Sequence, residues 1–268
     1  MSIVDGKAIA TEIREEVARE IESSGQAPRL GIVACAPNFE TVRYLELKEK
    51  IASTLGVTVD RVMLDGTATT KELVEVVKEL ALRTDGLVVQ LPLPTHIDRE
   101  VVLAAVPPAR DVDVFAYAGE VTEVLPPVVG AIAEIAKRTG VTWSGASVVI
   151  FGSGKLVGEP MAAFARVAGS TVTVVTKDTE PAVAHSLSQT ADIIVLGAGK
   201  AGLLTKDMVK PGVVVFDAGA SEDGGVLVGD ADPEIAEIAS VFTPVPGGIG
   251  PITIALLFRN LLKLSLRQ

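Results

Sequence analysis

Short apolar runs alternate with amphipathic segments along most of the chain, and this alternation constrains its fold more than any other feature. The apolar runs have the length of buried strands and cover residues 29–35, 57–64, 86–91, 147–151, 171–176, 193–196 and 213–217. Helical periodicity or helix caps mark residues 9–21, 38–55, 70–84, 99–106, 128–138, 156–167, 181–189, 233–239 and 252–264. Repeated strand–helix alternation predicts an α/β fold with mostly parallel sheets and helices on both faces.

The alternation stops in a stretch rich in proline and acidic residues, 107–127, and then starts again. A length of 268 residues is comfortable for two domains. We therefore predict two α/β domains, over residues 1–118 and 119–250, with a cleft between them. The last helix has no strand after it, so we expect residues 251–268 to pack back on the first domain.

Composition limits the partners and the compartment. A net charge of -10 argues against binding to nucleic acid or to an anionic membrane. The single cysteine, Cys35, cannot form an internal disulfide, and with two histidines it makes a poor metal set, so we expect no metal. The N-terminus has no signal-peptide core, and Arg259, Asn260 and Lys263 interrupt the apolar C-terminal run. We expect a cytoplasmic protein without a membrane partner.

A glycine-rich turn lies between the strand 147–151 and the helix that follows it. Glycines let the backbone approach a pyrophosphate, and the helix N-terminus supplies N–H groups and a partial positive charge. This context predicts that the second domain is a Rossmann-type NAD(P)-binding domain. The candidate cofactor contacts are Gly152, Ser153, Gly154, Lys155, Val157 and Gly158.

The end of the next strand bears on the choice between NAD and NADP. Asp178 lies at the usual offset for an acid that binds the adenosine ribose, whereas Lys177 beside it could receive a 2′-phosphate. Thr176 and Lys177 join the candidate cofactor contacts, and the two neighbouring charges leave the choice open.

Tyr44 and Lys48 share one face of the predicted helix 38–55 with Ile51 and Leu55. A lysine at the edge of an apolar stripe either snorkels outward or lines a cleft with a lowered pKa. The spacing alone favours snorkelling. Gln90, delivered by the strand 86–91 to the carboxyl edge of its sheet, and Asp113, in the acidic loop, favour a catalytic cleft instead.

Several motifs follow one another along the chain. The first half has Tyr44-x-x-x-Lys48, then Gln90-Leu91-Pro92-Leu93-Pro94, then Asp111-Val112-Asp113. The second half has the glycine turn, Asp217-x-Gly219, Val228-Gly229-Asp230 and the run from Pro244 to Thr253. In this order, the motifs resemble the methylenetetrahydrofolate dehydrogenase/methenyltetrahydrofolate cyclohydrolase family over essentially the whole chain.

The resemblance implies an enzyme of one-carbon metabolism with two activities. It would oxidise 5,10-methylenetetrahydrofolate with NADP (NAD being possible) and hydrolyse the methenyl product to 10-formyltetrahydrofolate. The first domain would be catalytic, with Lys48 as the catalytic lysine, Tyr44 beside the folate, Gln90 tuning the lysine and Asp113 holding the pterin. Further substrate contacts would come from Pro246, Gly247, Gly248 and Thr253, and the enzyme would be a homodimer.

Departures from the family pattern keep alternatives open. Val114 stands where the family usually has glycine, and the stretch 115–125 is shorter than usual. Ser153-Gly154 and Thr176-Lys177 also differ from the common residues at those positions. The alternatives are a single-activity dehydrogenase or cyclohydrolase on this scaffold, a shikimate-type two-domain dehydrogenase, and a non-catalytic folate or nucleotide sensor.

Overall fold

The chain forms two compact α/β units in a computed structural model that describes residues 2–224 and 226–267. One unit contains Glu12–Ala116, Glu123–Leu125 and the chain from Ile254 on. The other contains the first residues through Thr11, then Tyr117–Thr122 and Pro126–Thr253. We call them the Lys48 unit and the glycine-turn unit, after the candidate residues that each contains.

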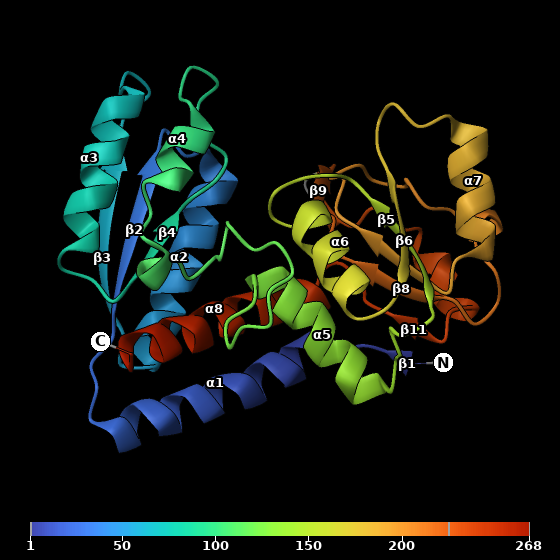
Figure 1. The fold of residues 1–268 in the computed structure, drawn as a ribbon, viewed down its shortest axis with the longest axis horizontal. Helices are drawn as coiled ribbons and strands as arrows, with labels where there is room; N and C mark the ends of the chain where they lie inside the picture. Colours follow the sequence, from blue (N-terminus) through green and yellow to red (C-terminus); the bar gives the residue numbers. More distant parts are fainter. Residues whose placement is uncertain (1, 225, 268) are drawn as a thin grey trace. The chain divides into compact units, whose positions relative to one another are not determined.

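The Lys48 unit is built on a three-stranded parallel sheet in the order β3-β2-β4 (Figure 1). Its strands are β2 (Arg29–Cys35), β3 (Thr58–Leu64) and β4 (Gly86–Val89). Its helices are α2 (Phe39–Thr54), α3 (Thr70–Ala81), α4 (Arg99–Ala104) and the short η1 (Pro108–Arg110). The core between them is apolar and almost fully buried, and it includes Val33, Leu73, Val77, Leu80, Leu87, Val89 and Val102.

Two helix starts in this unit follow from local sequence. Asn38 caps α2, and Thr69 with Glu72 forms a capping box at α3 in which each side chain bonds the other residue's backbone N–H. Both caps are as predicted. Helix α3 ends at Ala81, three residues before the predicted end at 84.

The glycine-turn unit contains a six-stranded sheet in the order β1-β11-β8-β7-β5-β6, with every pair parallel. Its strands are β1 (Ser2–Ile3), β5 (Ser147–Phe151), β6 (Thr171–Val175), β7 (Ile193–Leu196), β8 (Val214–Asp217) and β11 (Val241–Phe242). Its helices are α5 (Pro127–Thr139), α6 (Gly158–Val167) and α7 (Pro181–Thr190), with the short η2 (Lys206–Met208) and η3 (Pro233–Glu237). A two-stranded hairpin, β9 (Ser221–Asp223) and β10 (Val226–Val228), follows β8. The predicted parallel α/β class is confirmed.

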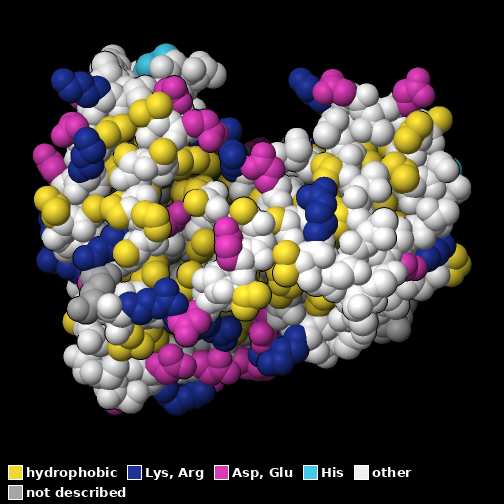
Figure 2. Space-filling model, in the orientation of Figure 1, with side chains coloured by type: hydrophobic (Ala, Val, Ile, Leu, Met, Phe, Trp, Pro, Cys, Tyr) yellow, Lys and Arg dark blue, Asp and Glu magenta, His cyan; other side chains and the backbone are white. Residues whose placement is uncertain are grey.

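Two long helices, α1 (Gly6–Ser24) and α8 (Ile249–Ser265), have residues in both units. Ile13, Val17 and Ile21 are buried along α1, as their four-residue spacing predicts. Figure 2 shows a row of acidic side chains where Figure 1 draws this helix. The C-terminal part of α8 belongs to the Lys48 unit.

Some elements differ from the prediction. The segment predicted as a helix over 233–239 is a 3-10 turn, Pro233–Glu237, capped by Asp232. Helix α8 begins at Ile249 instead of 252, because Pro251 is tolerated within a first helical turn. Strands β1 and β11 have two residues each, too few for a sequence pattern, and their pairing places the first residues in the second sheet. The cleft expected between the domains stays a prediction.

In the part of the chain that the structure describes, no helix combines the length and the apolar character needed to span a bilayer.

Candidate active site

Helix α2 carries Tyr44 and, one turn later, Lys48. Its start is fixed by Asn38, whose side chain accepts a 2.8 Å hydrogen bond from the N–H of Thr41. Lys48 is only 5% exposed, although the spacing alone favours a lysine that snorkels to solvent. The structure therefore buries an amino group, which requires polar partners around it in either protonation state.

Gln90 and Tyr44 supply those partners. The Lys48 Nζ donates a 2.9 Å hydrogen bond to Oε1 of Gln90 and lies 4.8 Å from the centroid of the Tyr44 ring. Gln90 directly follows β4, and its backbone N–H donates to the carbonyl of Val33, which extends the strand pairing. Its Nε2 donates to the carbonyl of Leu91 at 2.8 Å, so the amide has a defined orientation.

Asp111 and Asp113 have different roles in the acidic loop. The carboxylate of Asp111 accepts hydrogen bonds from the N–H groups of Asp113, Val114 and Phe115, at 3.0, 2.8 and 2.7 Å. A parallel bridge between Leu87 and Asp111 places this turn beside β4. Asp111 thus shapes the backbone, and Asp113 is the acid whose charge couples to Lys48.

Burial and mutual charge shift the titration of the site. Burial lowers the pKa of Lys48, and the charge of Asp113 partly opposes that effect. Burial also raises the pKa of Asp113 to about 7, a shift that Lys48 opposes and Asp111 reinforces. Tyr44 is 37% exposed, but desolvation of its phenol and, to a smaller extent, the charge of Asp113 raise its pKa to about 12, so the phenol is neutral at physiological pH. A lysine with a lowered pKa and an acid with a raised pKa are both suited to exchange protons near neutral pH.

The predicted cofactor turn connects β5 to α6. Gly152 has a φ of +100°, and a Cβ there would lie 2.7 Å from the carbonyl oxygen of Gly197. A Cβ on Gly158 would lie 2.1 Å from the carbonyl oxygen of Gly152. The turn therefore requires glycine at both positions, and it forms a cradle of bare backbone.

The rest of the turn leads into α6 without a polar cap. Val157 occupies the N-cap position, and its side chain cannot accept hydrogen bonds from the first N–H groups of the helix. Lys155 pairs with Glu159 at 3.1 Å. The structure thus brings Gly152, Ser153, Gly154, Lys155, Val157 and Gly158 to one helix N-terminus, as predicted, and this arrangement suits an anionic group.

The residues after β6 form a short turn. The N–H of Thr176 donates to Oγ1 of Thr179 at 3.0 Å, and the N–H of Asp178 donates to Oγ1 of Thr176 at 3.3 Å. The side chains of Lys177 and Asp178 are both exposed. The turn exposes a cation that suits NADP next to an anion that suits NAD. The structure therefore does not decide between the two cofactors.

The candidate loop before α8 packs on the first turn of α1. The N–H of Gly6 donates to the carbonyl of Gly247 at 2.9 Å, and a Cβ on Gly6 would lie 1.7 Å from the carbonyl oxygen of Gly248. Pro246 is exposed, and Oγ1 of Thr253 donates to the carbonyl of Ile249. Gly6 is thus a requirement of this loop that sequence reasoning missed.

Two buried acids, Asp217 and Asp230, organise the loops at the carboxyl ends of β7 and β8. Asp230, fully buried, accepts hydrogen bonds from three consecutive N–H groups, those of Ala198, Gly199 and Lys200, at 2.8, 3.1 and 2.7 Å. Asp217 accepts bonds from the N–H groups of Gly219 and Ala231, and burial raises its pKa to about 6.

Each of these acids packs against the glycine that lies near the other acid in sequence. A Cβ on Gly219 would lie 2.2 Å from the carboxyl carbon of Asp230, and one on Gly229 would lie 2.1 Å from Oδ2 of Asp217. The sequence motifs Asp217-x-Gly219 and Val228-Gly229-Asp230 are therefore one interlocked unit. The sequence marks both acids through these motifs, but neither motif predicts that each acid holds the other's loop.

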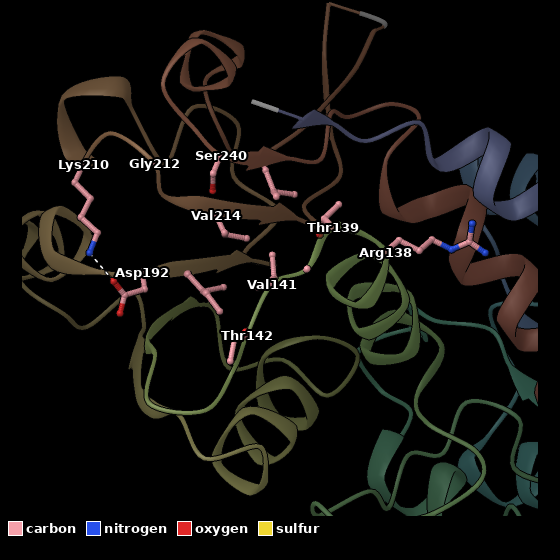
Figure 3. Close-up of a pocket in the computed structure, with 12 residues that line it drawn as sticks. Arg138, Thr139, Val141, Thr142, Asp192, Lys210, Gly212, Val214 and Ser240 are labelled. Atoms are coloured by element: carbon pink, nitrogen blue, oxygen red, sulfur yellow. Dashed lines mark hydrogen bonds and ion pairs between the residues drawn. The ribbon is translucent and has the colours of Figure 1, made fainter.

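A hollow of about 490 Å³ lies at the opposite edge of the same sheet (Figure 3). It is lined by residues just before β7, β8 and β11, at the amino ends of these strands, whereas the glycine turn follows a carboxyl end. Its cations are paired, Lys210 with Asp192 at 2.6 Å and Arg138 with Glu134 at 2.8 Å. We therefore do not assign the candidate chemistry to this hollow.

Comparison with known proteins decides the family. Residues 4–113 match the family model described as tetrahydrofolate dehydrogenase/cyclohydrolase, catalytic domain, and residues 126–268 match the model of its NAD(P)-binding domain. The chain belongs to the tetrahydrofolate dehydrogenase/cyclohydrolase family. The resemblance seen in the sequence is confirmed, and the shikimate-type alternative is set aside.

Relatives in this family match over nearly their whole length. The bifunctional protein FolD of Campylobacter concisus is 38% identical, with 97% of this chain and 96% of that protein aligned. The crystal structure of the bifunctional FolD of Campylobacter jejuni has a TM-score of 0.93 at 33% identity, covering 100% of this chain and 99% of that one. The FolD structure from Trypanosoma brucei, complexed with NADP cofactor and inhibitor, has a TM-score of 0.94 at 31% identity, covering 99% and 97%.

Proposed function

We propose that this chain oxidises 5,10-methylenetetrahydrofolate to 5,10-methenyltetrahydrofolate with NADP and hydrolyses the product to 10-formyltetrahydrofolate. The observation that carries this proposal is the buried amino group of Lys48, held by Gln90 beside the ring of Tyr44 and coupled to Asp113. A protein that only binds folate has no need of a desolvated lysine. The relatives named as bifunctional enzymes support both activities.

The substrate roles follow from the chemistry of each group. We assign the Tyr44 ring to stack beside the folate, and the Asp113 carboxylate to accept hydrogen bonds from pterin N–H groups. Lys48 is the residue that transfers protons, and Gln90 orients it. We also assign substrate contacts to Pro246, Gly247, Gly248 and Thr253.

Hydrolysis adds water to the methenyl carbon of a cationic ring. The new carbon–oxygen bond forms as the water loses a proton, for which the neutral amine of Lys48 is the acceptor. The bond from that carbon to N5 of the folate then breaks as N5 gains a proton. One of the water's two protons ends on N5 and the other is released, so that the cation and water give the 10-formyl product and one proton.

The glycine turn suits a nicotinamide dinucleotide. A Cβ at Gly152 or Gly158 would collide with backbone carbonyls, so glycine keeps the turn tight, and the start of α6 offers N–H groups to a pyrophosphate. When bound, the nicotinamide supplies the acceptor for the hydride that leaves the folate's one-carbon bridge. We propose NADP as the cofactor, with Lys177 and Thr176 at the 2′-phosphate, and with NAD as the possible alternative.

We further propose which domain binds which ligand, where the enzyme is located and how many subunits it has. Residues 1–118, with 251–268, were predicted as the folate domain and 119–250 as the NAD(P) domain. We keep this assignment for the Lys48 unit and the glycine-turn unit, with the difference that the chain through Thr11 belongs to the glycine-turn unit. The protein is a cytoplasmic homodimer with no nucleic-acid partner. The lone cysteine supports the cytoplasmic location, and the net charge of -10 argues against a nucleic-acid partner.

The test assays both reactions on the purified chain, with NADP and with NAD, for the wild type and for Lys48→Met. Wild type is expected to catalyse both steps, and Lys48→Met is expected to lose methenyl-folate hydrolysis by about a hundredfold or more. Lys50→Met, which alters an exposed lysine of the same helix, serves as the matched control. Hydrolysis at the wild-type rate in Lys48→Met would refute the assignment, and a wild type with one activity would establish the single-activity alternative.

A further inference from the structure

Asn260, on α8, connects two distant points of the loop that carries Asp113. The residue is 5% exposed, and its Nδ2 donates to the carbonyl oxygens of Val112 and Leu125, at 3.0 and 2.8 Å. Both hydrogens of one amide are thus used on backbone acceptors at the two ends of the segment 112–125. All three residues belong to the Lys48 unit.

The carbonyl of Val112 belongs to the peptide that leads directly into Asp113. On the other side of this peptide, the Asp111 carboxylate binds three successive N–H groups and begins the turn. The carbonyls of the turn therefore need donors from other elements. Asn260 is the donor to the carbonyl of Val112, which directly precedes Asp113. The peptide between Val112 and Asp113 is therefore fixed on both sides. Its N–H donates to the Asp111 carboxylate, and its carbonyl accepts from Asn260.

Packing around the same peptide keeps α8 at a fixed distance from the site strand. A Cβ on Gly86, at the start of β4, would lie 2.5 Å from the Val112 side chain and 2.7 Å from that of Leu261, the neighbour of Asn260. Four residues later, the same chain segment delivers Gln90. The loop, the strand and the helix therefore meet with no space between them at this point.

We infer that Asn260 is a positioning residue for Asp113, acting through the backbone of Val112. The inference rests on the proposed function, in which Asp113 binds the pterin. A neutral amide is suited to this task because it supplies two donors without placing a charge among buried carbonyls. A small shift of the Val112 peptide would move the Asp113 carboxylate relative to Lys48, which would weaken folate binding and alter the pKa of the acid.

The experiment compares Asn260→Leu and Asn260→Ser with Lys263→Met in the full-length enzyme. Leucine fills the same space without a donor, and serine leaves room for water at the carbonyls, so it is the milder change. Lys263 donates to the carbonyl of Glu123 from the next turn of α8, so its variant loosens the same loop without touching Val112. The readouts are the KM for methenyl-folate, the pH dependence of hydrolysis, the KM for NADP and the melting temperature.

We expect Asn260→Leu to raise the KM for methenyl-folate by about tenfold, and Asn260→Ser to raise it by less. Both are expected to move the acidic limb of the pH profile, while the KM for NADP stays unchanged. Lys263→Met is expected to leave all kinetic constants within about twofold. Asn260 variants with a lower melting temperature but a wild-type KM and pH profile would show a purely structural role and overturn the inference. A wild type without either activity would instead overturn the proposed function, and it is measured first.

Discussion

Lys48 and Gln90 face each other in a single orientation, with the lysine Nζ donating to the amide Oε1 at 2.9 Å and the amide Nε2 donating to the carbonyl of Leu91. A neutral acceptor stabilises the ammonium less than a carboxylate would, so burial is left to lower the pKa of Lys48. The choice of an amide at this position therefore keeps the lysine able to release its proton.

Gln90→Glu tests this relationship with a change of one atom. A carboxylate beside Lys48 is expected to raise the pKa of the lysine and hold it protonated, which removes the base at neutral pH. Hydrolysis at pH 7 should fall by about tenfold to a hundredfold and recover in part at higher pH. The pH profile of methenyl-folate hydrolysis measures both effects, and a profile unchanged from wild type would contradict them.

The pH dependence of folate turnover should reveal Asp113. Burial raises the pKa of this acid to about 7, so it is ionised above that pH and protonated below it. Because the proposed pterin contact needs the carboxylate, kcat/KM for methenyl-folate is expected to fall as the pH drops below about 7. Asp113→Asn should lower kcat/KM and shift the acidic limb, because only the protonation of Lys48 then limits hydrolysis at low pH. An acidic limb at the wild-type position in the variant would mean that Asp113 does not set it.

Regular elements were predictable wherever local sequence decides the structure. Strands β2, β5 and β7 have the predicted bounds because each is an apolar run of strand length between polar or turn residues. The caps at Asn38 and Thr69 are likewise local. In contrast, β1 and β11 exist only because they pair with each other and with β8 across the whole chain.

The site was predictable as a set of residues but not as an arrangement. Spacing places Lys48 at the edge of an apolar stripe, and only tertiary packing decides that it is buried. The structural roles of Asn260 and Asp230 could not be predicted, because their hydrogen-bond partners lie up to 148 and 32 residues away in sequence. A hydrogen bond of that range leaves no local pattern, even where it holds a reactive group in place.

Cofactor choice should depend on Lys177. If its exposed ammonium binds the 2′-phosphate, Lys177→Ala is expected to raise the KM for NADP by about tenfold and to leave the KM for NAD unchanged. Asp178→Ala removes the neighbouring acid and should act in the opposite direction on NADP, because it relieves repulsion of the phosphate. Steady-state kinetics of the dehydrogenase with both cofactors measures the change. An NADP preference that survives Lys177→Ala would exclude Lys177 as the phosphate partner.

The backbone conformation of Val114 gives a physical reason why the family usually has glycine at this position. Its φ of +54° lies in the left-handed region, which costs a β-branched residue roughly 1–2 kcal/mol and glycine almost nothing. The hydrogen bond from the Val114 N–H to Asp111, at 2.8 Å, holds the residue there. Val114→Gly keeps that N–H, so the turn at Asp113 should survive the substitution.

We expect Val114→Gly to stabilise the fold by about 1 kcal/mol, because relief of strain exceeds the added entropy of a glycine in the unfolded chain. Val121→Gly is the matched control, since Val121 is 98% exposed and lies in the same loop without a positive φ. That change should be neutral or destabilising by up to about 1 kcal/mol. Denaturant unfolding of both variants decides the matter, and an equal loss of stability in the two would show that Val114 is not strained.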